Sequence, residues 1–217
     1  ETRGINRFKG LLLSLEFAQE HGEAIEDFTL FANWCNHTTS LSNQSLEEEI
    51  AKHNDTVLIK ALEWSKAVNH GIETELVGED KPFEGVKRAL EEISKVAQIA
   101  IVSSANSEAV NSEWKRHGLM PFVSEFFGQE RGSKAAAIKE IKSLGFEKEK
   151  ILMVGDAPGD LDAAKVNEVH FYPILFGKER ESWATLVTNI LPEFIDGQYN
   201  DEEYQAIYHK HLSQFKN

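Results

Sequence analysis

The sequence has little cysteine, little positive charge and no long apolar run. Its single cysteine, Cys35, excludes an internal disulfide and fits a protein of the reducing cytoplasm, where we expect it to be a packing residue. No apolar run approaches the ~20 residues that a membrane-spanning helix needs, so no membrane partner is expected. The 23 basic residues are outnumbered by 36 acidic ones, giving a net charge of −13. Nucleic acid is therefore not an expected partner, although a small basic pocket for an anion is compatible with this charge.

Two patterns divide the chain. Residues 1–80 show helical spacing of apolar residues only, and we expect N-caps at Ser45 and Asp55. From Pro82 onward, apolar strands alternate with amphipathic helices, which predicts parallel β-α units in residues 81–217 and a C-terminal helix on the outside of the sheet. The expected strands are 99–102, 122–127, 151–154 and 169–174. This order predicts an α/β fold with an α-helical domain before it.

The most informative motif is the apolar run at residues 151–154, which leads into a glycine turn carrying Asp156 and Asp160. Open α/β sheets bind ligands at the carboxyl ends of their strands. Two close carboxylates repel each other unless a cation lies between them, and Mg²⁺ accepts carboxylate oxygens together with waters and phosphate. The turn therefore predicts a metal site that handles phosphate esters. The alternative is an ordinary surface turn rich in Gly, Pro and Asp.

A second polar loop follows the strand predicted at residues 99–102. Ser103 and Ser104 bring hydroxyl and backbone N–H groups to its carboxyl end, where they are suited to hold a phosphate oxygen. Asn106 lies in the same loop and is a further candidate for phosphate binding. The alternative is that these side chains only cap the next helix.

A lysine opens the helix that is predicted after Ser133. Lys134 lies in its first turn, where the helix dipole favours negative charge rather than positive charge. An anion near Lys134 would remove this conflict. The alternative is a solvated lysine, the commonest state of this residue type.

A basic cluster lies near the beginning of the sequence. It consists of Arg3, Asn6, Arg7 and Lys9. Arginine forks suit phosphates and carboxylates, so Arg7 is a candidate for binding the anionic part of a substrate. A solvated helix start is the alternative.

The order of these motifs resembles the haloacid dehalogenase superfamily of phosphotransferases. Its second motif, a strand ending in Ser or Thr, matches Ser103, and its third, a lysine that opens a helix, matches Lys134. Its fourth, Gly-Asp-x-x-x-Asp after a strand, matches Asp156 and Asp160. Residues 82–86 also look like the segment that follows the family's helical cap. The likeness covers about residues 80–176 and is closest to the phosphoglycolate-phosphatase-like branch. It implies a Rossmann-like core with an α-helical cap in residues 1–80.

The resemblance also implies roles for these side chains. Asp156 would hold Mg²⁺, with Asp160 as a second ligand, directly or through water. Ser103 would bind the transferring phosphoryl group, and Lys134 would neutralise its charge and help to orient the nucleophile. These roles suit phosphoryl transfer, which depends mainly on positioning and charge stabilisation.

The family's first motif is not found. That motif is Asp-x-Asp at the end of the central strand, and its first aspartate is the nucleophile that forms an aspartyl-phosphate. The only Asp-x-Asp here is Asp160–Asp162, which already belongs to the acidic turn. In this fold, the missing strand lies between the strands ending at Ser103 and Val154. Three explanations remain: an N-terminal segment outside this chain, a strand from a partner, or an inactive relative whose sheet closes differently. We favour the first, because unpaired backbone groups inside a sheet are costly.

The leading hypothesis is therefore a cytoplasmic, Mg²⁺-dependent phosphatase acting on a small phosphorylated metabolite. The alternative is a catalytically inactive protein that binds a phospho-ligand or a protein partner. A dehalogenase or phosphomutase on the same scaffold is a third option. The sequence fixes neither the substrate nor the oligomeric state.

Overall fold

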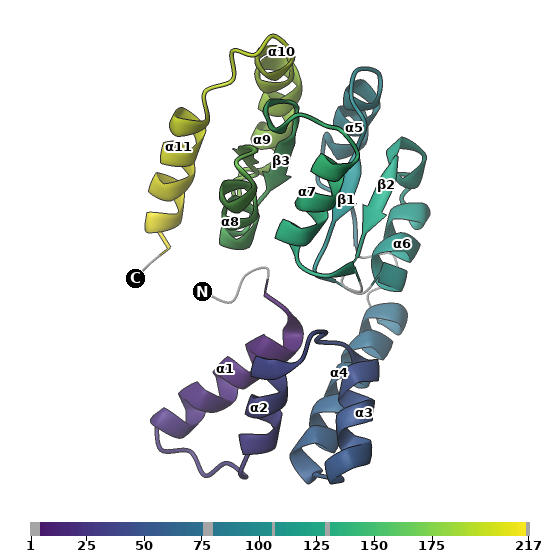
Figure 1. Cartoon of the computed structure of the whole chain (residues 1–217), viewed down its shortest axis with the longest axis vertical. Coiled ribbons are helices and arrows are strands. Elements are labelled where there is room, and N and C mark those ends of the chain that lie inside the picture. The colour runs from purple at the N-terminus through teal and green to yellow at the C-terminus, as the bar shows by residue number, and fades with distance from the viewer. Residues whose placement is uncertain (1–4, 76–79, 106, 129–130, 216–217) are drawn as a thin grey trace. The chain divides into compact units, whose positions relative to one another are not determined.

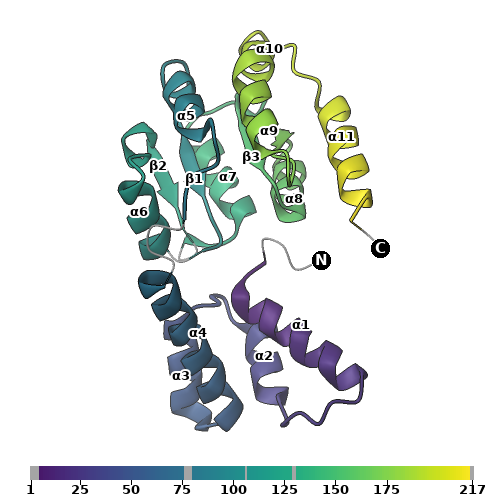
Figure 2. The same cartoon turned by 180° about the vertical axis from the view of Figure 1, so that it is seen from behind.

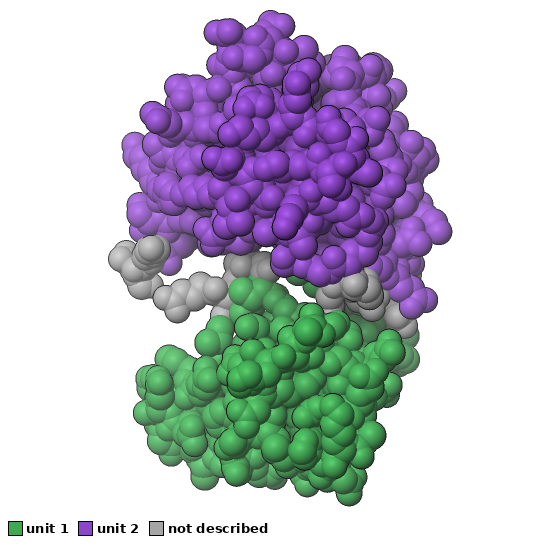
Figure 3. Space-filling model, viewed as in Figure 1, with its two compact units in different colours: residues 1–81, 104–106 green, residues 82–103, 107–217 purple. Residues whose placement is uncertain are grey.

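The computed structural model describes residues 5–75, 80–105, 107–128 and 131–215. By its contacts the chain forms two compact units, residues 1–81 with 104–106 and residues 82–103 with 107–217 (Figure 3). The sequence predicted one boundary, between residues 80 and 81. The observed boundary is one residue later, and residues 104–106 join the first unit. No helix in the described part has the length and hydropathy to cross a membrane.

The first unit consists of four helices in its described part (Figure 1). They are α1 (Arg7–Glu20), α2 (Thr29–His37), α3 (Asn43–His53) and α4 (Thr56–Thr74). Their apolar faces meet in one core around Phe8, Phe31, Leu46 and Leu58, all of which are buried. The expected helical domain is therefore present, and Asp55 caps α4 as expected by accepting the N–H groups of two residues in its first turn.

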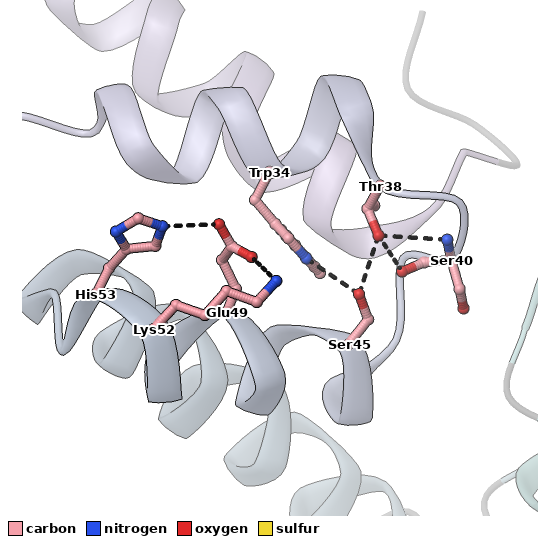
Figure 4. Close-up of polar contacts among 7 residues, drawn as sticks. All are labelled: Trp34, Thr38, Ser40, Ser45, Glu49, Lys52 and His53. Atoms are coloured by element: carbon pink, nitrogen blue, oxygen red, sulfur yellow. Dashed lines mark hydrogen bonds and ion pairs between the residues drawn. The ribbon is translucent and has the colours of Figure 1, made fainter.

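The expected cap of α3 is wrong by one turn. The helix begins at Asn43, and Ser42 is its N-cap, whose side chain accepts the Ser45 N–H. Figure 4 shows what Ser45 does instead: its Oγ accepts a hydrogen bond from Trp34 Nε1 (3.1 Å) and also bonds Thr38 Oγ1 (2.9 Å). The Ser45 hydroxyl thus ties α3 to α2.

Cys35 is buried in the core of the helical unit, with its Sγ 3.8 Å from the Phe8 carbonyl oxygen. Burial raises the pKa of its thiol from 9.0 to about 12. Folding therefore favours the neutral thiol. The stability that this preference contributes is complete below pH 9.0 and is lost as the pH rises towards 12.

Alkylation of Cys35 tests this burial. At pH 8.5 we expect iodoacetamide to modify the native protein about 100-fold or more slowly than the urea-unfolded chain, because the reactive thiolate is depleted and shielded. Mass spectrometry reports the rate without ambiguity, since the chain has one cysteine. Equal rates for the native and unfolded chains would contradict the buried position.

The second unit alternates strands and helices, as predicted, so the fold is α/β. Its strands are β1 (Ala100–Val102), β2 (Glu125–Phe127), β3 (Leu152–Gly155) and β4 (His170–Pro173). Its α-helices are α5 (Val86–Ser94), α6 (Ser107–Arg116), α7 (Lys134–Ser143), α8 (Pro158–Asn167), α9 (Glu179–Thr185), α10 (Leu191–Ile195) and α11 (Asp201–Ser213). Short turns of other helix types are η1 (Met120–Phe122), η3 (Lys148–Lys150) and η4 (Leu186–Ile190). The helical run from α9 to α10 was not anticipated from the sequence.

The strands form two separate parallel pairs among the described residues. In the first pair, Ala100 of β1 lies opposite Glu125 of β2, and in the second, Leu152 of β3 lies opposite His170 of β4. We expected a parallel sheet core, and the parallel direction is confirmed. However, within the described ranges β1 and β3 each have only one hydrogen-bonded neighbour.

Helix α5 contributes to two apolar clusters of this unit. Its Leu90 belongs to a cluster against which Ile99, the residue before β1, also packs. Its Ile93 packs against a second cluster, against which Leu152 and Val154 of β3 also pack. Both clusters therefore include side chains of α5. At the other end of the unit, α11 lies at the outer edge in both views (Figures 1 and 2) and packs on β4.

Candidate functional site

The acidic loop lies at the carboxyl end of β3, as the sequence predicts. Asp160 is the third residue of α8 and is only 2% exposed. Its Oδ2 accepts the N–H of Ala157 at 2.9 Å, which satisfies one of the free N–H groups at the beginning of this helix. The carboxylate therefore holds the loop that carries Asp156 in a defined shape.

Gly155 allows this loop to fold over its own strand. A Cβ atom built on Gly155 would overlap the carboxyl group of Asp160. Only a residue without a side chain leaves room for the carboxylate to lie against the backbone here. The glycine of the Gly-Asp motif is therefore explained by the space that the Asp160 carboxylate occupies.

Lys134 is the partner of Asp160. It is the first residue of α7, whose N-cap Ser133 accepts the N–H of Ala136, as the sequence predicts. The Lys134 Nζ forms a salt bridge with Asp160 Oδ1, and the two side chains are 18% and 3% exposed. Lys134 is therefore not a solvated lysine. The anion that balances it at this helix end is a carboxylate of the same chain.

The sequence did not predict the tyrosine that bonds the backbone of the acidic loop. Tyr208 of α11 is buried, and its hydroxyl donates a hydrogen bond to the Asp156 carbonyl oxygen (2.9 Å). Its ring also packs edge-on against Phe171 of β4. The aromatic residues of the C-terminal helix were the available signal, but they indicated only that the helix packs on the sheet.

The serine loop lies at the carboxyl end of the other strand pair. The Ser103 N–H donates to the carbonyl oxygen of Phe127 at 2.9 Å, continuing the β1–β2 pairing by one residue. Ser103 is half-buried, and so is Ser104, whose contacts group it with the helical unit. Asn106 lies outside the described residues. The structure thus joins Lys134, Asp160 and the Asp156 loop by direct contacts, whereas convergence with Ser103 stays a prediction.

Arg7 belongs to the helical unit and is held there by polar contacts. Its Nη1 donates to Asn69 Oδ1 (2.6 Å) and to the Ser65 carbonyl and hydroxyl oxygens (3.1 and 3.3 Å). Burial lowers the pKa of this guanidinium. Arg7 is therefore not the solvated side chain that the sequence left as the alternative.

The donor set for Mg²⁺ is incomplete in the described part of the chain. That part contains no group of three His, Cys, Asp or Glu side chains in reach of one ion. Asp160 uses one oxygen for Lys134 and the other for the backbone of Ala157. Asp156 fits as one carboxylate ligand, because Mg²⁺ fills much of its octahedron with water and phosphate.

Of the comparisons with known proteins, the family model is the one that shows the family of this chain. The similar solved structures include a haloacid dehalogenase-like family hydrolase from Streptococcus pneumoniae, with 16% identity, 72% of this chain and 71% of that chain covered, and a TM-score of 0.47. Another is a haloacid dehalogenase-superfamily hydrolase of subfamily IA from Geobacter sulfurreducens, with 15% identity, coverages of 72% and 74%, and a TM-score of 0.43. A search of curated proteins gave no match. The model of the haloacid dehalogenase-like hydrolases matches residues 23–174, which is most of the chain. The chain therefore belongs to the haloacid dehalogenase-like hydrolase family.

Proposed function

We propose that this chain forms part of a cytoplasmic, Mg²⁺-dependent phosphatase that hydrolyses a small phosphorylated metabolite. The observation that carries the proposal is the salt bridge of Lys134 with Asp160, fixed beside the Asp156 loop at the carboxyl end of β3. In this type of phosphoryl transfer, a positioned positive charge and a metal ion act together at the carboxyl ends of the strands. In this proposal, Lys134 supplies the positive charge and Asp156 supplies one ligand for the metal.

In this proposal, each side chain has one task. Lys134 balances the negative charge of the phosphoryl oxygens, while Asp160 keeps its ammonium group in place. Ser103 donates hydrogen bonds to the same oxygens from the end of β1. Asp156 holds Mg²⁺, which lowers the charge on the phosphoryl group when bound.

The nucleophile is proposed to lie on a strand N-terminal to residue 1. The support is the pairing pattern: among the described residues β1 and β3 each have one neighbour, yet side chains of α5 belong to the clusters beside both strand pairs. Ala100 is exposed and Val154 only half-buried, although central strands of a parallel sheet are normally buried on both faces. One parallel strand between β1 and β3 would pair both edges. An Asp-x-Asp at its carboxyl end would face the serine and acidic loops.

The proposed reaction has two steps. A carboxylate oxygen of the first aspartate forms a bond to phosphorus as the ester P–O bond breaks, and the second aspartate gives a proton to the leaving alcohol. A water oxygen then forms a bond to phosphorus as the bond between phosphorus and the first aspartate breaks. The water gives a proton back to the second aspartate, and inorganic phosphate is released. In both steps, Lys134 balances the negative charge of the phosphoryl oxygens.

A second candidate is a protein that binds a phospho-ligand or a protein partner without catalysis. It is favoured by the incomplete ligand set in the described part of the chain. The two candidates differ in whether an upstream strand with Asp-x-Asp exists.

The native polypeptide decides between them. We expect its N-terminal sequencing to reveal an apolar segment ending in Asp-x-Asp before Glu1, and we expect it to hydrolyse p-nitrophenyl phosphate in a reaction that EDTA stops. Residues 1–217 alone should show no turnover, which serves as the control. A native protein without that segment, or with it but without hydrolysis, would refute the phosphatase and support the binding protein.

A further inference from the structure

The helical unit contains an open pocket that the proposed reaction does not use. It has a volume of about 490 Å³, within the range of small-molecule sites. The first turns of α1 and one side chain of α4 form it. Its lining residues are Ile5, Asn6, Arg7, Gly10, Leu11, Ser14 and Trp64.

The floor of the pocket includes a glycine inside a helix. Gly10 lies within α1, where glycine is less favourable than alanine by about 1 kcal/mol. A Cβ atom there would meet Ile5 Cδ1 at 3.8 Å, an ordinary contact, so nothing in the packing forbids a side chain. A longer side chain at this position would instead occupy the pocket. Glycine at position 10 therefore leaves the pocket open, although alanine or leucine there would stabilise the helix.

Arg7 is the charged residue among the lining residues of the pocket, and hydrogen bonds to α4 hold its guanidinium in place. Ser65, which accepts from Arg7 Nη1, is 1% exposed and donates to Asn43 Oδ1 at 2.7 Å. These contacts use one of the three guanidinium nitrogens. In the described part of the chain, the hydrogen bonds of Arg7 all come from Nη1. With no partner among the described residues, the Nε and Nη2 groups can donate to a ligand in the fork geometry that matches a carboxylate.

The other walls are apolar or already satisfied. Asn6 uses its amide to cap α1 and to bond the Leu41 carbonyl oxygen. The Ser14 hydroxyl donates to the Gly10 carbonyl oxygen. Leu11 and the Trp64 ring supply apolar surface, and Trp64 remains 39% exposed. A ligand would therefore need one anionic group for Arg7 and a flat apolar body for the tryptophan.

We propose that this pocket binds a small organic carboxylate, with the carboxylate on Arg7 and an apolar body against Trp64 and Leu11. The site goes beyond the proposed phosphatase reaction, because it uses residues of the helical unit alone and requires no catalysis. Arg7 is the charged residue among the pocket's lining residues, and its guanidinium gives the pocket a local preference for an anion against the chain's net charge of −13.

Benzoate is the probe for this site, with benzyl alcohol and acetate as its matched analogues. We expect saturable benzoate binding to the full chain, seen as a shift of the Trp64 indole signal in ¹H–¹⁵N spectra. Benzyl alcohol lacks the charge and acetate lacks the apolar body, so each should bind at least about 10-fold more weakly. This test needs no turnover, so a failed phosphatase assay and a failed binding assay remain distinguishable.

Gly10→Leu is the decisive variant. It should weaken benzoate binding at least about 10-fold without lowering the melting temperature, because leucine is a better helix former than glycine. Gly71→Leu is the matched control: Gly71 also lies within a helix, α4, and a Cβ atom there meets nothing within 4 Å. This control should bind benzoate like the wild type. Arg7→Ala is less informative, since Arg7 also ties α1 to α4.

Four results would overturn the proposal. The first three are no saturable benzoate binding by the wild type, unchanged binding by Gly10→Leu, and equal losses in Gly10→Leu and Gly71→Leu. Benzyl alcohol binding as tightly as benzoate would also overturn it, because the pocket would then bind apolar bodies without using Arg7.

Discussion

Lys134→Met is expected to lower the free energy of unfolding by about 3 kcal/mol. The substitution keeps most of the apolar stem of the side chain and removes only its charge. Asp160, with its side chain 3% exposed, then remains as a buried carboxylate without its cation. Removing one partner of a buried pair is more damaging than its net stabilisation suggests, because the remaining charge is both desolvated and unpaired. Urea unfolding monitored by circular dichroism measures the change.

The double variant Lys134→Met/Asp160→Asn is the control for this prediction. Asparagine keeps an oxygen that accepts the Ala157 N–H but carries no charge. We expect the double variant to be more stable than Lys134→Met alone, which would show that the loss comes from the stranded charge. If Lys134→Met is as stable as the wild type, or if the double variant is no more stable than Lys134→Met, the pair is not coupled as the structure describes.

If the proposed metal site is right, Asp156→Asn is expected to reduce phosphate-ester hydrolysis by the native polypeptide about 100-fold or more, because it removes the proposed Mg²⁺ ligand that helps to balance the phosphoryl charge. Stability without metal should change little. Tyr208 bonds the backbone carbonyl oxygen of residue 156, and this contact is retained when the side chain becomes an amide. Initial rates with p-nitrophenyl phosphate over a range of Mg²⁺ concentrations measure the loss.

Asp162→Asn is the matched control. Asp162 is exposed on α8, and the same change of one oxygen to nitrogen there should leave the rate and its Mg²⁺ dependence unaltered. An Asp156→Asn protein with normal Mg²⁺-dependent turnover would remove the metal assignment. Equal losses in both variants would show that net charge, rather than ligation, is responsible.

The order of elements in the second unit was predictable because each has a local signature. The apolar run at residues 151–154 is a strand in the structure up to Gly155, and Ser133 caps the helix that Lys134 opens. The conflict between Lys134 and its helix dipole was also visible, and it correctly indicated a nearby anion. That the anion is Asp160 could not be read from the sequence, because the two residues are 26 positions apart.

Other features depended on tertiary contacts that no local pattern encodes. Ser45 and Ser42 are both good caps, and the bond from Trp34 decides that Ser45 serves the packing of α2 on α3. The contact of Tyr208 with the Asp156 loop spans 52 positions. The separation of the strands into two pairs was foreseeable only from the missing first motif, since each strand by itself looks like part of one sheet.

A single titration tests the central claim, that the serine loop, Lys134 and the acidic loop bind one phosphoryl group. The ¹⁵N-labelled native polypeptide is titrated with inorganic phosphate in the presence of Mg²⁺. The amide signals of Ser103, Lys134 and Asp156 are predicted to shift together and to follow one binding isotherm. If phosphate leaves these signals in place, or moves them with unrelated affinities, the three groups do not form one site.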